Sequence, residues 1–203
     1  MKICKKTTAA LLAIAVVFCL AACGGQDKQE ETAPDNAAQT TDTAESSDTL
    51  VVYFSATGTT RGVAEIIAKV TGGDLYEIIP EEPYTDTDLD YNDSKSRATR
   101  EQNDESVRPQ IDGKDISLDS YTTIYIGYPI WWGQEPRIMD TFVENHDFGD
   151  KTVIPFCTSG SSNIDKSSSN LSEKAGSGKW LKGDRLEGSS SESDIKKWIA
   201  KFN

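Results

Sequence analysis

Short apolar runs alternate with stretches of helical periodicity along residues 49–203. The predicted strands span residues 50–54, 75–79, 124–127 and 153–157, with a weaker fifth strand at 180–186. Helices are predicted around residues 63–70, 137–144 and 195–202. The strands are nearly uninterrupted apolar runs, which is typical of parallel strands that are buried on both faces. We therefore expect an α/β fold: an open five-stranded parallel sheet with helices on both faces, in three layers (α/β/α).

Two segments depart from this regular alternation. Residues 80–113 are highly charged and too long for a simple connection, and residues 94–105 within them have the pattern of an exposed helix. We interpret residues 80–113 as a solvated insertion in preference to a surface that docks a partner. Ser189 and Glu192, which precede the last predicted helix, are placed as a capping box.

The first 23 residues have the pattern of a secretory signal. Three lysines precede an apolar run over residues 9–22, which is shorter than the ~20 residues of a membrane span. The run ends in Leu-Ala-Ala-Cys, which resembles the bacterial lipobox. The resemblance implies that residues 1–22 are a cleaved lipoprotein signal peptide and that Cys23 is lipidated. An uncleaved anchor is the alternative, and either one places the folded domain outside the cytoplasmic membrane, attached to its outer face.

Residues 23–48 are expected to form an acidic, disordered tether. Residues 24–48 contain no Val, Ile, Leu, Met, Phe, Trp or Tyr, so they cannot bury enough apolar surface to fold. Without the three signal lysines, the formal net charge of -12 becomes -15, which disfavours nucleic acid as a partner. Cys157 is the only thiol in the single domain predicted at residues 49–203, so no intramolecular disulfide is expected.

The turn after the first predicted strand carries the main candidate chemistry. It consists of Ser55, Ala56, Thr57, Gly58, Thr59 and Thr60. Ligands of open α/β sheets bind beyond the carboxyl ends of the strands, and a helix N-terminus presents unpaired N–H groups with a partial positive charge. The turn is therefore a candidate phosphate loop, although it lacks the Gly-Lys ending of a nucleotide-hydrolysing P-loop and the spacing of a Rossmann fingerprint. A capped turn without a ligand explains these six residues equally well.

A family resemblance decides between these alternatives. The sequence Ser-x-Thr-Gly-x-Thr at residues 55–60 is similar to the FMN-phosphate loop of flavodoxins, and the element order over residues 49–203 resembles that family as well. The resemblance implies a flavodoxin-like fold with flavin mononucleotide (FMN) as its cofactor. It also implies that the hydroxyls and backbone amides of residues 55–60 surround the phosphate. Thr59 stands where many flavodoxins have Asn, and it keeps a side-chain donor.

Two more loops after predicted strands complete the candidate cofactor site. The loop that the resemblance places beside the isoalloxazine ring comprises Pro129, Ile130, Trp131, Trp132 and Gly133. The loop that borders the other side of the flavin in related families comprises Thr158, Ser159, Gly160 and Ser161. Because neighbouring side chains point apart, we expect one tryptophan to pack inward and Trp132 to face the flavin.

The sequence indicates neither a catalytic set nor a metal site. Cys157 stands at a strand end, as in Cys-x5-Arg phosphatases, but position 163 is Asn, so we interpret Cys157 as an ordinary strand residue. His146, the only histidine, is interpreted as a solvated loop residue. No Cys/His cluster has the spacing of metal ligands.

Three functions fit the resemblance. The first is an electron carrier for redox partner proteins. The second is an FMN-dependent NAD(P)H quinone or nitro reductase, and the third is a non-redox flavin-binding lipoprotein. The acidic charge favours the carrier, because a negative rim steers docking to basic patches and opposes the binding of anionic NAD(P)H. The predicted location also separates the protein from cytoplasmic NAD(P)H. We therefore expect an electron-transfer protein in preference to an enzyme with its own substrate. The protein is expected to contact the membrane through its lipid.

Overall fold

The computed structural model describes residues 47–202, so the predicted signal peptide, Cys23 and nearly all of the tether lie outside the described residues. The main sheet contains β1 (Thr49–Tyr53), β2 (Asp74–Glu77), β5 (Thr123–Pro129), β6 (Thr152–Thr158), β7 (Lys179–Trp180) and β8 (Asp184–Arg185). Its strand order is β2-β1-β5-β6-β7, and β8 also pairs with β6. All of these pairings are parallel. The predicted parallel sheet is confirmed.

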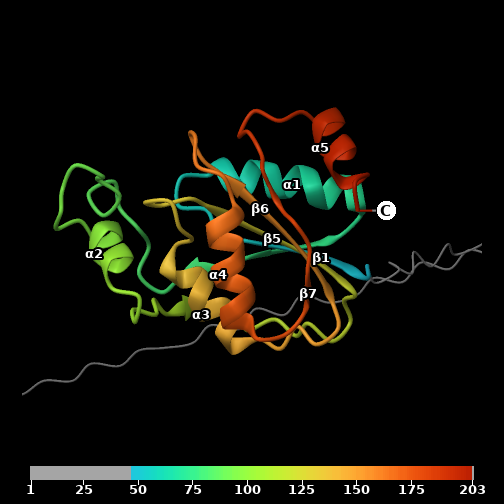
Figure 1. Cartoon of the computed structure of the whole chain (residues 1–203), viewed down its shortest axis with the longest axis horizontal. Helices are drawn as coiled ribbons and strands as arrows, with labels where there is room; N and C mark the ends of the chain where they lie inside the picture. The colour runs from blue at the N-terminus through green and yellow to red at the C-terminus, as the bar shows by residue number, and fades with distance from the viewer. Residues whose placement is uncertain (1–46, 203) are drawn as a thin grey trace, which may run out of the picture. The chain divides into compact units, whose positions relative to one another are not determined.

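Helices cover both faces of this sheet (Figure 1). α1 (Thr59–Thr71) and α5 (Glu192–Ile199) lie on one face, where Val51 and Tyr53 of β1 join their apolar core. α3 (Arg137–Asn145) and α4 (Asp165–Ala175) lie on the other face, where Leu50 and Val52 join a second core. The side chains of successive strand residues therefore pack in opposite cores, as a pleated strand requires. The three-layer α/β/α arrangement is confirmed.

The strand order reverses beside β1. From β1 the chain moves outward to β2 and then returns to pair β5 with the other side of β1. In doubly wound sheets, the loops at such a switch point diverge and leave a crevice between them. The loops after β1 and β5 lie at this point.

The predicted fifth strand is split into β7 and β8. β7 pairs with Thr152 and Val153, whereas β8 pairs with Phe156 and Cys157. The gap falls at Pro155, which has no backbone N–H and interrupts a ladder of hydrogen bonds. This edge is therefore two short strands in one position of the sheet.

The insertion predicted at residues 80–113 is more structured than its charge predicts. Its outer part, residues 81–110, lies between two short strands and is called the insertion below. It is closed at its base by the antiparallel pair β3 (Ile79–Pro80) and β4 (Ile111–Asp112), and it carries α2 (Arg97–Asn103). α2 lies apart from the sheet layers (Figure 1). One of its faces is buried and comprises Ala98, Thr99, Glu101 and Gln102. The expected exposed helix is therefore shorter than predicted, and most of it is buried.

The last helix begins two residues later than the predicted cap. Ser191 is the N-cap of α5, and it forms a capping box with Asp194. The predicted pair of Ser189 and Glu192 is wrong, because the chain is still in a turn at Ser190, whose amide donates to the carbonyl of Glu187. Within residues 47–202, every helix is too short or too polar to cross a bilayer.

Candidate cofactor site

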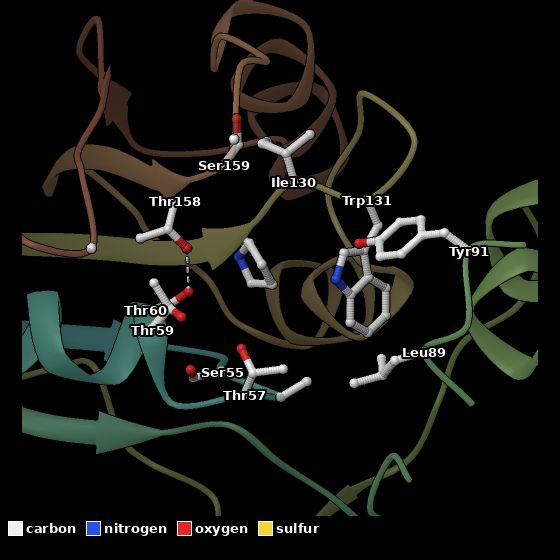
Figure 2. Close-up of a pocket in the computed structure, with 14 residues that line it drawn as sticks. Ser55, Thr57, Thr59, Thr60, Leu89, Tyr91, Ile130, Trp131, Thr158 and Ser159 are labelled. Atoms are coloured by element: carbon white, nitrogen blue, oxygen red, sulfur yellow. Dashed lines mark hydrogen bonds between the residues drawn. The ribbon is translucent and has the colours of Figure 1, made fainter. Parts of the chain in front are cut away.

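A cavity of about 430 Å³ opens at the carboxyl ends of β1, β5 and β6. Figure 2 shows Ser55 and Thr57 on one side of it, Thr158 and Ser159 on the opposite side, and Trp131 at one end. Its volume is within the range of small-molecule sites, about 300–1,000 Å³. The predicted residues that line it are Ser55, Ala56, Thr57, Thr59, Thr60, Pro129, Ile130, Trp131, Thr158, Ser159 and Gly160. The three predicted loops therefore meet at one site.

Four predicted residues are not among those that line the cavity: Gly58, Trp132, Gly133 and Ser161. Gly58 shapes the loop with its backbone, because its φ of 87° lies in the left-handed region that favours glycine. Gly133 does the same in the second loop, with a φ of 77°. Ser161, the last residue of the third loop, is exposed.

The N-terminus of α1 lacks a side-chain cap. Gly58 occupies the N-cap position and has no side chain to accept from the first-turn amides. The Ser55 hydroxyl accepts from the amide of Gly58 itself (3.1 Å), which tightens the turn before the helix. A helix start without a cap leaves amide donors and a partial positive charge that attract an anion. Thr57 and Thr59 line the cavity next to these amides.

A buried hydroxyl pair joins the first loop to the third. The Oγ1 atoms of Thr60 and Thr158 lie 2.8 Å apart, and both side chains are buried. Figure 2 shows this hydrogen bond as a dashed line between the two side chains. Arg185 of β8 holds the third loop as well, since its Nη1 donates to the carbonyl oxygen of Ser159 (2.9 Å). The loops around the cavity are therefore tied to each other and to the sheet edge.

Gly188 brings the chain after β8 close to the start of α1. A Cβ atom at this position would lie 2.5 Å from Cγ2 of Thr59, so a larger residue would force the two segments apart. Gly188 also lines the cavity, but it was not predictable, because a lone glycine in a polar segment gives no sequence pattern.

The two tryptophans of the second loop are placed differently, and Trp131 is the one that packs inward on the core. Trp131 lines the cavity and is 4 % exposed, whereas Trp132 is 39 % exposed and lies outside the lining. The cause is a tight turn: Trp131 and Gln134 exchange backbone hydrogen bonds of 2.9 and 3.0 Å, and the φ values of Trp132 (48°) and Gly133 (77°) are both positive, as in a type I′ turn. This turn directs Trp132 away from Trp131 and onto the ring of Tyr91, so Trp132 does not line the cavity itself, and its contact with the flavin stays a prediction.

The insertion supplies part of the cavity wall, an unexpected role for a segment predicted to be solvated. Leu89 and Tyr91 line the cavity (Figure 2). Tyr84 packs edge-on against Trp131, with ring centroids 5.1 Å apart. The aromatic and leucine residues among the charges of residues 81–110 were the available signal. The interpretation of this segment as a solvated insertion is therefore wrong for these residues.

The other chemical candidates are structural residues. Cys157 lies within β6 and is fully buried, and burial raises the pKa of its thiol to about 12. It is therefore protonated at neutral pH and is not a thiolate nucleophile, in agreement with its interpretation as a strand residue. The side chain of His146 is only 8 % exposed and stacks on Phe142, so the expected solvated histidine is wrong. No cluster of three or more potential metal ligands occurs in the described residues.

Together, these features define a doubly wound α/β protein with a cavity at its switch point. A family model for flavodoxin matches residues 48–202, and the chain belongs to the flavodoxin family. The strand order β2-β1-β5-β6-β7 is the flavodoxin-like order. A search of curated proteins found no match.

Solved structures of flavoproteins are similar to this chain. A protein from Bacteroides uniformis ATCC 8492, assigned as a flavoprotein, is 47 % identical over 75 % of this chain and 97 % of its own, with a TM-score of 0.72. One from Bacteroides eggerthii DSM 20697, with the same assignment, is 44 % identical over 75 % of this chain and 96 % of its own (TM-score 0.71). A flavoprotein from Lactobacillus acidophilus NCFM, crystallised in complex with FMN, is 25 % identical over 74 % of this chain and 97 % of its own (TM-score 0.57).

Proposed function

We propose that this flavodoxin binds FMN in the cavity and transfers electrons between redox partner proteins at the outer face of the cytoplasmic membrane. The observation that carries the proposal is the α1 N-terminus without a side-chain cap, which lies next to a cavity with an aromatic end. FMN has a phosphate at one end and a flat ring system at the other, so it matches both features.

The residues present fit FMN. The amides at the start of α1 and the hydroxyls of Ser55, Thr57 and Thr59 would hold the phosphate. Trp131 and the backbone near Ile130 would lie beside the ring. Bound FMN supplies the redox chemistry, since its ring accepts and releases electrons. The FMN complex of the Lactobacillus acidophilus flavoprotein supports this choice of cofactor.

Charge supports the carrier over the reductase. The chain has a formal net charge of -12, and three of its positive charges lie in the proposed signal peptide. Such a surface attracts partner proteins with basic patches and repels anionic NAD(P)H. We propose that the attachment to the membrane is a lipid on Cys23, which lies outside the described residues.

Anaerobic titration of the purified full-length chain, followed by flavin absorption, tests the electron-transfer proposal. We expect dithionite to reduce the bound FMN completely and reversibly, and NADPH to reduce it only slowly. Rapid multiple turnover of NADPH with a quinone acceptor would show a reductase instead. If the bound FMN does not accept electrons from dithionite, the protein only binds flavin.

Labelling cells with radioactive palmitate tests the membrane attachment. We expect the native protein to carry the label and to partition into detergent. The Cys23→Ser variant should carry none, because the acylated thiol is absent. A native chain without label would contradict the lipid anchor.

A further inference from the structure

The insertion forms a wall of the cavity that the strand-end loops do not provide. Leu89 and Tyr91 line the cavity from residues 81–110, whereas the other lining residues come from the three loops and Gly188. In Figure 2 the Leu89 side chain and the Tyr91 ring both point from the insertion toward the cavity, near Trp131. These two side chains are apolar or aromatic, so they offer contacts to a ring and not to a phosphate.

This wall is anchored to the domain core through Tyr84. The Tyr84 ring packs on Phe54 (5.8 Å between centroids) and on Trp131 (5.1 Å), and the Arg97 guanidinium lies 4.0 Å from its centre. Burial raises the pKa of the Tyr84 hydroxyl, which therefore remains protonated and donates to Oε2 of Glu101 (2.6 Å). Trp131 and the base of the insertion are thus packed as one unit.

A second anchor holds the end of α2. Arg137 of α3 is fully buried, and its Nε and Nη2 donate to the carbonyl oxygens of Glu101 (3.2 Å) and Gln102 (3.1 Å). These carbonyls belong to the last turn of α2, where helix carbonyls run out of intrahelical partners; the Glu101 carbonyl also accepts from the amide of the C-cap residue Asp104 (3.3 Å). The charge of Arg137 is balanced by Asp140 (3.4 Å) and Glu135 (3.8 Å), which are both buried.

The outer edge of the wall contacts the second loop. The Tyr91 ring lies on the Trp132 ring, with centroids 4.3 Å apart and an angle of 33° between the planes. Trp132 is the only non-glycine residue with a positive φ in the described part of the chain. This backbone conformation, which the type I′ turn requires, places its ring against that of Tyr91. Contacts within the protein therefore hold the insertion at both ends and at its edge, which reduces the ordering cost of ligand contacts.

We propose that Leu89 and Tyr91 are specificity-determining residues that recognise the flavin ring system, separately from the loop that holds the phosphate. This inference rests on the proposed function, because it assigns the ring of FMN to this wall. It divides the affinity for FMN into two parts: a ring part from the insertion and Trp131, and a phosphate part from residues 55–60.

The test compares the affinities for FMN and riboflavin, measured by quenching of flavin fluorescence with the full-length chain in detergent. Tyr91→Ala and Leu89→Ala should each weaken both ligands by the same factor, about 2- to 10-fold, because the ring contact is common to both. Tyr91→Phe should restore the affinity, since the flat ring is retained. Asn92→Ala is the matched control, because Asn92 is exposed and outside the lining.

Unchanged affinity for both flavins in Tyr91→Ala and Leu89→Ala would overturn the inference, as would a loss that is confined to FMN. Circular dichroism checks that each variant is folded, and the half-exposed position of Tyr91 makes its truncation tolerable (55 % exposed). If the native chain does not bind FMN at all, the proposed function itself is wrong, and the role of the insertion falls with it. The two failures are therefore distinguishable.

Discussion

Two helices of this domain begin after turns rich in Ser and Thr, yet their N-termini are built differently. α5 closes its first turn with its own side chains: the Ser191 hydroxyl accepts from the amide of Asp194 (3.2 Å), and the Asp194 carboxylate accepts from the amide of Ser191 (3.2 Å). α1 starts at Gly58, which offers no side-chain cap. The first turn of α5 is thus satisfied internally, whereas that of α1 has donors available for a ligand.

The difference teaches that hydroxyl content alone does not mark a phosphate site. Both turns are rich in hydroxyls, but only the turn before α1 lies at the switch point of the sheet and faces a cavity. What distinguishes it is the glycine at the N-cap, which removes the competing acceptor and lets the chain enter the helix with a φ of 87°. The proposed phosphate site therefore depends on a missing cap.

The largest effect is expected when α1 is given a cap like that of α5. Gly58→Asp places a carboxylate at the N-cap, where it accepts from the first-turn amides and repels a phosphate. Two lost charge-assisted hydrogen bonds should weaken FMN by about 100-fold or more. Calorimetric titration measures the change, and Gly58→Asn is the matched control because it differs only in charge. Because Asn caps a helix as well as Asp does, equal effects of the two variants would show that the added charge does not matter.

A smaller effect is expected from the side chains around the open turn. Thr57 lines the cavity with an exposed hydroxyl, and Thr57→Val replaces that hydroxyl with a methyl group of similar shape. The loss of one charge-assisted hydrogen bond should weaken FMN by about 10-fold and leave riboflavin unchanged. A parallel loss for riboflavin would place Thr57 at the ring and not at the phosphate.

The smallest effect is expected at α5, where the cap is structural. Ser191→Ala removes both hydrogen bonds of its hydroxyl and should lower the free energy of unfolding by about 1 kcal/mol. Urea denaturation followed by circular dichroism measures this change. The affinity for FMN should not change in the folded protein, and a loss of affinity would mean that the two helix starts are coupled.

The strands, the layers and the three loops of the candidate site were predictable from the sequence, because each rests on a local pattern. Apolar runs of four or five residues marked β1, β5 and β6, and a loop with recognisable chemistry followed each of them: polar after β1 and β6, aromatic after β5. α4 was not predicted, because only Ser167 and Leu171 of this helix are buried and no apolar stripe results.

The errors arose where tertiary contacts decide. Which tryptophan lines the cavity was also not predictable, because it depends on a turn with two positive φ values, of which only the glycine is visible in the sequence. The wall formed by Leu89 and Tyr91 depends on long-range contacts of Tyr84 and Arg137. The sequence gives no sign of these contacts, because the residues around Leu89 and Tyr91 are highly charged. Membership of the flavodoxin family was predictable, since it rests on the six residues after β1 and on the element order.

The ratio of the affinities for FMN and riboflavin, measured by calorimetry with the full-length chain, tests the central claim most directly. The account assigns the open turn of α1 and its hydroxyls to the phosphate, which riboflavin lacks. At least two charge-assisted hydrogen bonds to the phosphate predict an FMN affinity about 100-fold or more above that of riboflavin. Equal affinity for the two flavins would contradict the phosphate role of residues 55–60.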